Sequence, residues 1–492
     1  MRLPPAFAAI ALALAPMTVL AAPAAGDQTA PARFVTEHTG TFHHQPVRYT
    51  ATVAATVIDQ DPAIPPVSLF TTAYVRTDVA DRAGRPVVFF FNGGPGAPSD
   101  WLNLGAFGPK RLAISPDTNA PAPVAPALVD NDRSPLDVAD LVFIDPAETG
   151  FSRVLPGGDR ARLYTTAGDA QSIADLITAW LKANGREASP RYLVGESYGT
   201  IRAALVAGLM SKSLPLDGVV LVSQAVNIIE TSQRAVNPVG YATNLTALAA
   251  IAAYHGRADL HGKSLSAFVD EAYAWGMGEY LEALVKGADL PAADQARIAA
   301  RLQAFTGISA DYYLAHHLII SKVQFRSELL RDKGLVLGVA DARYTGPGPA
   351  PGTPAADPFA KVQAGIAAPL RSYLTGDLGV TLPIGDYRRQ APDTSTWVYT
   401  PTRGDGGPFA DWDYPASITA AMKAKPTFRL MITTGYYDLM TAIGPAQFMV
   451  AKSDWPKDRV TLHRYVGGHM SYTHAPSLVA ITDDVRAFIA KP

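Results

Sequence analysis

Short apolar runs alternate with helical patterns in the first half of the chain, and this alternation constrains the fold more than any other feature. The runs lie at residues 87–91, 139–145, 191–195 and 217–223. They are rich in β-branched and aromatic residues, which is typical of strands buried on both faces. Strands that alternate with helices predict a mostly parallel sheet covered on both faces, so we expect an α/β fold.

The strand pattern extends to either side of this region. Residues 33–40, 47–59 and 67–77 are rich in Thr and Val and predict antiparallel strands at one edge of the sheet. Residues 428–435 and 459–468 again have strand character, after a long stretch with helical patterns. We therefore expect one core in two parts with a large helical insertion between them. The expected bounds are 27–225 and 396–492 for the core and 226–395 for the insertion.

The N-terminus has the pattern of an export signal. Arg2 supplies a positive charge, residues 6–15 are apolar, and small residues near Ala21 suit a signal peptidase. A membrane anchor is the alternative, but prolines interrupt the apolar run and it is short for a bilayer span. We expect residues 1–21 to be a signal peptide and the mature protein to be periplasmic or secreted, without stable membrane insertion.

The composition excludes several classes of function. The chain has 492 residues and no cysteine, so it has neither disulfides nor a catalytic thiol. Its formal net charge of −2 gives no sign of nucleic-acid binding. His38, His43, His44, His316 and His317 lack the spacing of metal ligands, and no dinucleotide or Walker A motif is present. We expect neither a metal nor a cofactor.

The sequence GESYG, residues 195–199, lies between a predicted strand and a predicted helix. This is the context that a G-x-S-x-G nucleophile elbow requires, with Ser197 as the nucleophile. The glycines fit because neighbouring backbone comes close to such a turn and a Cβ would clash. A Gly-bounded turn with an idle serine is the alternative.

A nucleophilic serine needs a base and an acid, and in this fold the acid follows the serine along the chain and the histidine base comes last. Asp438 comes just after one predicted strand and His469 just after the next, so both fall where loops at the sheet edge gather functional groups. His463 and His474 are competing bases, but His463 lies inside the strand pattern. The other candidate acids are Asp454 and Asp458, in a charged loop that looks solvated.

Acyl transfer also needs two backbone N–H donors for the developing oxyanion. One is expected from Tyr198, which follows the nucleophile. The other is expected from an earlier loop after a strand, where Gly93 and Gly94 follow residues 87–91. Glycine allows close approach to the substrate, and Pro95 stiffens the turn.

These motifs resemble those of the serine carboxypeptidases, a family of α/β-hydrolases. The family's N-G-G-P-G-C-S-S, G-E-S-Y-A-G and G-H-M-V-P correspond here to NGGPGAPS (92–99), GESYGT (195–200) and GHMSY (468–472). IDPAETGFSR (144–153) is similar to the family's L-D-x-P-x-x-x-G-F-S. The matching segments occur in the family's order from about residue 85 to 475.

The resemblance implies an α/β-hydrolase fold, a helical cap over the site, and a set of residue roles. Ser197, His469 and Asp438 would form the triad, with Gly94 and Tyr198 as the oxyanion hole. Asn92, Gly93 and Glu196 would bind the substrate, with Asn92 and Glu196 at its C-terminal carboxylate. Peptides with a free C-terminus would be the substrates. Contact between Glu196 and a carboxylate requires a proton on one of them, which favours acidic pH.

The chain departs from the family at a second carboxyl group. The family has a Glu in a segment ending Glu-x-Gly-Pro, and here that position is Ala106. The family's motif cysteine is also replaced, by Ala97. Glu148 is a possible substitute for the lost carboxyl, and the alternative is an exposed loop glutamate. Because Ala106 replaces the family's Glu, an esterase, amidase or acyltransferase with the same catalytic residues is an alternative to a carboxypeptidase. A non-catalytic binding protein is a third hypothesis.

Overall fold

The computed structural model describes residues 32–59, 65–120, 126–350, 352–399 and 412–491. The predicted signal peptide, residues 1–21, lies outside these residues and stays a prediction, as does the export that follows from it.

A ten-stranded sheet forms the centre of the described chain. Its order is β1-β2-β3-β7-β4-β9-β10-β13-β14, and β8 pairs with β3. The neighbouring strands β7, β4, β9, β10, β13 and β14 are parallel to one another. Strands β1, β2 and β3 continue the sheet as the predicted antiparallel edge. The bounds are β1 (Arg33–Phe42), β2 (Gln45–Ile58), β3 (Val67–Arg76), β4 (Val87–Phe91), β7 (Asp140–Asp145), β8 (Arg153–Val154), β9 (Arg191–Glu196), β10 (Gly218–Val222), β13 (Arg429–Gly435) and β14 (Val460–Tyr465).

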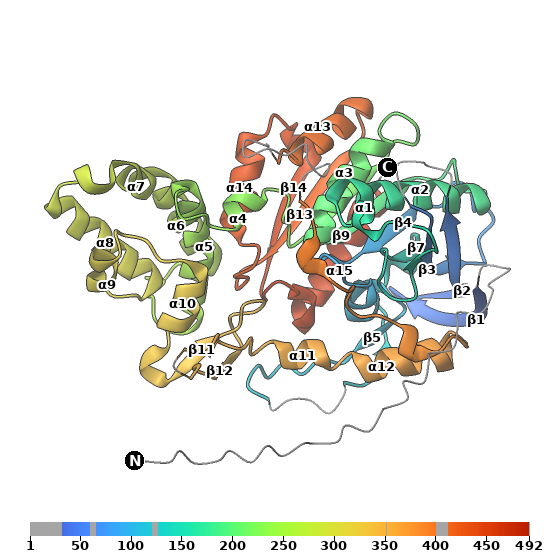
Figure 1. The fold of residues 1–492 in the computed structure, drawn as a ribbon, viewed down its shortest axis with the longest axis horizontal. Coiled ribbons are helices and arrows are strands. Elements are labelled where there is room, and N and C mark those ends of the chain that lie inside the picture. The colour runs from blue at the N-terminus through green and yellow to red at the C-terminus, as the bar shows by residue number, and fades with distance from the viewer. Residues whose placement is uncertain (1–31, 60–64, 121–125, 351, 400–411, 492) are drawn as a thin grey trace, which may run out of the picture.

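Helices cover both faces of this sheet, as Figure 1 shows. On one face lie α2 (Thr166–Ala183), α3 (Tyr198–Met210), α13 (Pro415–Ala424) and α14 (Ile443–Lys452). On the other lies α15 (Ala475–Ala490). The fully buried strand β4 contributes side chains to the cores on both faces of the sheet. Phe89 and Phe91 pack on the side of α2 and α3, and Phe90 packs on the side of α15. This alternation follows from the two-residue repeat of a strand, and the mixed, mostly parallel sheet confirms the predicted fold class.

A helical lobe projects beside the sheet, at the left of Figure 1. It has its own apolar core, which also takes in Tyr436, Tyr437 and Leu439 from the loop after β13. The lobe is therefore packed onto the segment that carries Asp438. Its helices are α5 (Pro238–Tyr254), α6 (Leu265–Trp275), α7 (Leu281–Lys286), α8 (Ala292–Thr306), α9 (Ala310–Ala315) and α10 (Lys322–Glu328).

The later part of the predicted insertion packs differently. Phe359, Ile366 and Leu370 belong to the apolar core of the sheet, and the Tyr373 hydroxyl lies 2.9 Å from that of Tyr74 in β3. The remaining short elements are α1 (Arg160–Leu163), α4 (Ile228–Thr231), α11 (Ala360–Ala364), α12 (Ala367–Ser372), β5 (Lys110–Leu112), β6 (Leu128–Asp130), β11 (Leu335–Leu337) and β12 (Thr345–Pro347). The domain boundaries themselves stay a prediction.

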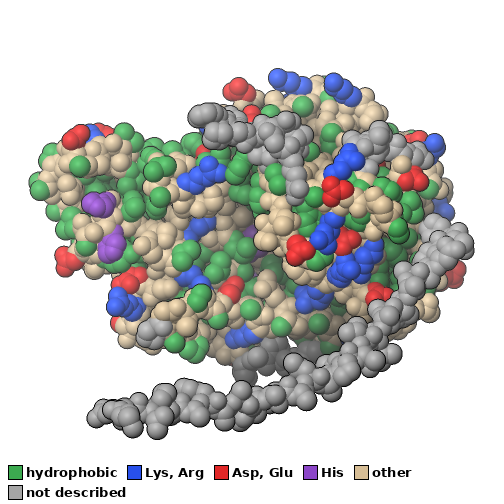
Figure 2. Space-filling view, viewed as in Figure 1, with side chains coloured by type: hydrophobic (Ala, Val, Ile, Leu, Met, Phe, Trp, Pro, Cys, Tyr) green, Lys and Arg blue, Asp and Glu red, His purple; other side chains and the backbone are tan. Residues whose placement is uncertain are grey.

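The surface is mixed in charge. On the face seen in Figure 2, acidic and basic side chains are interspersed over both the sheet region and the lobe. Within the described ranges, none of the helices combines the length and apolar character needed to cross a bilayer.

Candidate active site

Ser197 lies in the sharp turn between β9 and α3. Its backbone has φ 58° and ψ −127°, a conformation that side-chain-bearing residues rarely adopt. The serine is half-buried, and it directly precedes the first helical residue, Tyr198. The strained turn is the local geometry that the G-x-S-x-G pattern predicts for a nucleophile elbow.

Close backbone contacts explain the glycines around this turn. A Cβ on Gly199 would lie 2.7 Å from the carbonyl oxygen of Phe91, the last residue of β4. A Cβ on Gly93 would lie 2.5 Å from the backbone nitrogen of Tyr198. The loop after β4 and the elbow after β9 are thus pressed together, and only glycine fits at these contacts.

A buried ion pair fixes the same two loops. Arg202 in α3 is fully buried, and its Nε donates to Asp169 in α2 at 2.8 Å. Its Nη1 donates to the carbonyl oxygen of Asn92 at 2.7 Å. The Tyr198 hydroxyl also donates to Asp169, at 3.0 Å. Since these bonds join α2, α3 and the loop after β4, Arg202 and Asp169 hold the elbow against the glycine loop.

Asp438 and His469 form a buried hydrogen-bonded pair. His469 Nδ1 lies 2.9 Å from Asp438 Oδ2, with the two residues 5% and 0% exposed. The other carboxylate oxygen of Asp438 accepts from the backbone N–H groups of Met440 and Thr441 at 2.6 and 3.0 Å. These bonds fix the carboxylate, and the carboxylate in turn orients the imidazole.

Asp438 and His469 shift each other's pKa values. Burial alone would raise the pKa of Asp438, but the charge and hydrogen bond of His469 outweigh it and leave the pKa lowered. Burial would likewise lower the pKa of His469, and the Asp438 carboxylate outweighs it and leaves the pKa raised. The negative charge of Glu196 also raises the pKa of His469. An imidazole of this kind accepts a proton readily.

The competing candidates lie elsewhere. His463 pairs with Asp484 at 3.0 Å and is partly exposed, as its place in a strand predicts. His474 bonds to Ser477 at 2.9 Å, at the start of α15. Asp454 and Asp458 are exposed. The structure therefore brings Asp438, and none of these alternatives, to His469.

The predicted oxyanion loop follows the central strand β4. Gly94 has φ +103°, which only glycine adopts readily. Tyr198 is the first residue of α3, so its N–H has no acceptor within the helix. The loop and the helix start adjoin each other through the Gly93 contact described above. This arrangement suits a pair of N–H donors for an oxyanion.

Glu196 is buried in a small polar cluster. Its Oε2 accepts from the Tyr472 hydroxyl at 2.6 Å, and the Asn92 side chain also hydrogen-bonds to it. Asn92 Oδ1 accepts from the backbone of Leu102 at 2.9 Å, which fixes that side chain. Burial raises the pKa of Glu196 to about 7, even though His469, Tyr472 and Asn92 each act to lower it. Glu196 can therefore carry a proton near neutral pH.

The structure corrects the two interpretations of Glu148. Glu148 is 7% exposed, so it is not an exposed loop residue. Its carboxylate accepts from the backbone of Val154 at 2.8 Å and pairs with Arg388. The carboxylate is therefore engaged away from Glu196, and it does not replace the missing carboxyl. Ala106 itself is fully buried, in a short π-helical segment, Leu102–Phe107.

Lys322 joins the helical lobe to the acid loop. It is 9% exposed, and its Nζ donates to the carbonyl oxygens of Thr231 and Met440 at 2.7 and 2.9 Å. Burial lowers the pKa of this amine to about 8, while the Asp438 carboxylate opposes the shift. Because Met440 also donates to Asp438, Lys322 supports the loop that holds the acid.

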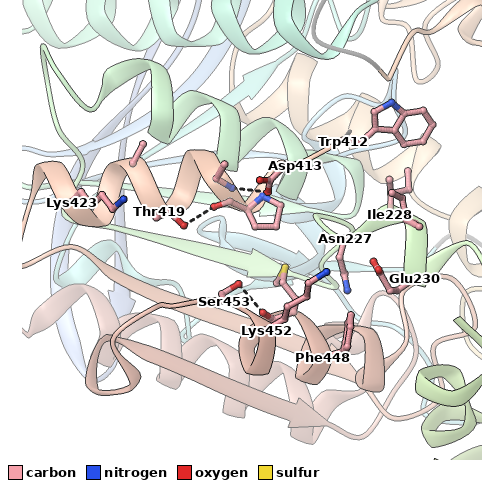
Figure 3. A pocket seen from close by; sticks show the side chains of 15 residues that line it. Asn227, Ile228, Glu230, Trp412, Asp413, Thr419, Lys423, Phe448, Lys452 and Ser453 are labelled. Atoms are coloured by element: carbon pink, nitrogen blue, oxygen red, sulfur yellow. Dashed lines mark hydrogen bonds between the residues drawn. The ribbon is translucent and has the colours of Figure 1, made fainter. Parts of the chain in front are cut away.

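A cavity in the described part of the chain lies outside the candidate active site. It has a volume of about 580 Å³ between α4, α13 and α14, with Trp412, Phe448 and Lys452 among its lining residues (Figure 3). Ser197, Asp438 and His469 do not line it. Among the described residues, no group of three or more His, Asp or Glu side chains is placed to hold a metal ion.

The fold and these residues define an α/β-hydrolase with the parts of a serine-dependent site. The family model of the serine carboxypeptidases matches residues 69–229, which include the glycine loop and the elbow. Over these residues the chain is similar to the serine carboxypeptidase family.

Two solved structures are similar to this chain at low sequence identity, and the first of them supports the fold. Kex1(Δ)p, a prohormone-processing carboxypeptidase from Saccharomyces cerevisiae, is 15% identical over 89% of this chain and 91% of that chain, with a TM-score of 0.52. Proline iminopeptidase from Mycobacterium smegmatis is 14% identical over 88% of this chain and 97% of that chain, with a TM-score of 0.38. No curated protein matches the sequence.

Proposed function

We propose that the chain is a serine carboxypeptidase that releases C-terminal residues from peptides through an acyl-enzyme. The observation that carries the proposal is the Asp438–His469 pair, placed at the same sheet edge as the strained Ser197. The match to the serine carboxypeptidase family model supports peptide substrates. The predicted signal peptide supports export to the periplasm or the medium.

In the proposed reaction, Ser197 Oγ attacks the carbonyl carbon of the last peptide bond and passes its proton to His469. Asp438 stabilises the resulting imidazolium, and the N–H groups of Gly94 and Tyr198 stabilise the oxyanion. His469 then protonates the leaving amine as the C–N bond breaks. Water repeats these steps on the acyl-enzyme, which releases the shortened peptide and restores Ser197.

Glu196 and Asn92 are proposed to bind the substrate's C-terminal carboxylate, beside Gly93. A carboxyl group donates a hydrogen bond to a carboxylate only while it is protonated. The raised pKa of Glu196, about 7, allows this at acidic to neutral pH. An esterase, amidase or acyltransferase remains the second candidate, since Ala106 is buried and supplies no second carboxyl.

A fluorophosphonate probe tests the nucleophile. We expect it to label the wild-type protein at Ser197, as mapped by mass spectrometry of the digested protein, and to leave Ser197→Ala unlabelled. Absence of labelling in the wild-type protein would instead support a non-catalytic binding protein. Digestion of a peptide mixture tests the exopeptidase activity, because a carboxypeptidase yields ladders shortened from the C-terminus and an endopeptidase yields internal fragments.

A further inference from the structure

Tyr472 contacts Glu196 from a segment three residues beyond His469. Its hydroxyl lies 2.6 Å from Glu196 Oε2, and the tyrosine is 2% exposed. Burial and the neighbouring Glu196 raise the pKa of this phenol well above its ordinary value of 10. The phenol is therefore a neutral, permanent donor at any pH at which the enzyme works.

The ring of Tyr472 packs on the short segment that carries Ala106. A Cβ on Gly105 would lie 2.8 Å from a ring carbon of Tyr472 and 3.1 Å from Trp101. Gly105, next to Ala106, thus leaves space that the aromatic ring fills. The position where the family has a carboxyl is small here, and a phenol from another loop reaches Glu196 instead.

We infer that Tyr472 replaces the missing second carboxyl as the hydrogen-bond partner that holds Glu196. Its O–H thereby sets the pH range over which the site binds a peptide's free carboxylate. Two carboxyl groups share a proton, whereas a phenol donates to Glu196 and leaves the carboxyl's own proton for the substrate. This inference rests on the proposed function and makes Tyr472 a positioning residue. The other groups that face Glu196 are His469 and Asn92, which favour its ionised form, and Asp100, which opposes it.

The test uses Tyr472→Phe, which keeps the ring and removes only the O–H. Loss of a donor to the carboxylate makes Glu196 harder to ionise, so the protonated form persists to higher pH. For a peptide with a free C-terminus, kcat/KM of the wild-type enzyme falls as Glu196 ionises. We expect this fall to move up by about one pH unit in Tyr472→Phe, through KM rather than kcat.

Tyr465→Phe is the matched control. Tyr465 donates to Asp484 at 2.6 Å, so the substitution deletes an equivalent phenol–carboxylate bond outside the site and leaves the profile in place. Fluorophosphonate labelling of each variant shows that its nucleophile is intact.

A C-terminally amidated peptide distinguishes failure of the role of Tyr472 from failure of the proposed carboxypeptidase activity. It needs no proton on Glu196, so it shows no fall with pH in either enzyme. If Tyr472→Phe leaves the fall for the free peptide where it is, or moves it no more than Tyr465→Phe does, the inference is wrong and the carboxypeptidase stands. If the wild-type enzyme treats both peptides alike, the proposed function fails, and the role of Tyr472 fails with it.

Discussion

Asp438 Oδ2 lies 2.9 Å from Nδ1 of His469, across 31 residues of sequence and from loops that follow two neighbouring parallel strands. In Asp438→Asn, an amide replaces the carboxylate that orients and charges the imidazole. We expect kcat on a small ester to fall about a thousand-fold or more, with little change in KM. Steady-state kinetics measures this, and His463→Asn, which alters a histidine–carboxylate pair outside the site, should leave kcat unchanged.

Because the backbone at Ser197 is strained, a substitution that relieves the strain should stabilise the protein. Glycine adopts φ 58° without the clash that a Cβ causes, whereas alanine keeps the clash. Ser197→Gly should therefore be more stable than Ser197→Ala by about 1 kcal/mol, although both are inactive. Urea unfolding of the two inactive variants isolates the backbone effect, and equal free energies of unfolding would contradict it.

The bond between Lys322 and Met440 predicts that the lobe and the acid loop are coupled. Lys322→Met leaves the carbonyl oxygens of Thr231 and Met440 without their donor. We expect a loss of about 1–3 kcal/mol in stability and a lower kcat, because the loop around Asp438 loosens. Lys361→Met removes a similar amine bonded to the carbonyl oxygens of Thr118 and Ala120, so it should cost stability without lowering kcat.

The pKa of Glu196 predicts a pH dependence of stability. A pKa raised from 4.5 to about 7 means that the folded protein holds this proton more tightly than the unfolded chain. Its contribution to stability is therefore complete below pH 4.5 and is lost as the pH rises to 7. Relative to Glu196→Gln, the wild-type protein should lose at most about 3 kcal/mol over that window. Asp145, whose pKa burial also raises to about 7, contributes equally to both proteins and cancels in the comparison.

Local patterns predicted the parts of the site that depend on local structure. The apolar strands, the Gly-bounded turn and the chain order predict that Ser197, Asp438 and His469 lie at one edge of the sheet. Gly199 was predicted from the need for close backbone approach at the turn, whereas Gly93 was predicted to approach the substrate and its contact with the backbone of Tyr198 was not foreseen.

The remaining contacts join residues far apart in sequence and leave no local pattern. Tyr472 and Glu196 are 276 residues apart, and Arg388 and Glu148 are 240 apart. Glu148 departs from both sequence interpretations, because only its distant partner Arg388 explains why it is buried. Lys322 and Arg202 look like ordinary helical cations until the fold places them against carbonyl and carboxylate oxygens.

Cleavage of one peptide and its C-terminally amidated twin is the decisive test of the proposed carboxypeptidase activity. Both are incubated with the wild-type protein and with Ser197→Ala at mildly acidic pH, and the products are read by mass spectrometry. We expect the wild-type enzyme to shorten the free peptide from its C-terminus and to process the twin much more slowly, and we expect Ser197→Ala to carry out neither reaction. Equal turnover of the two peptides would contradict the proposed activity.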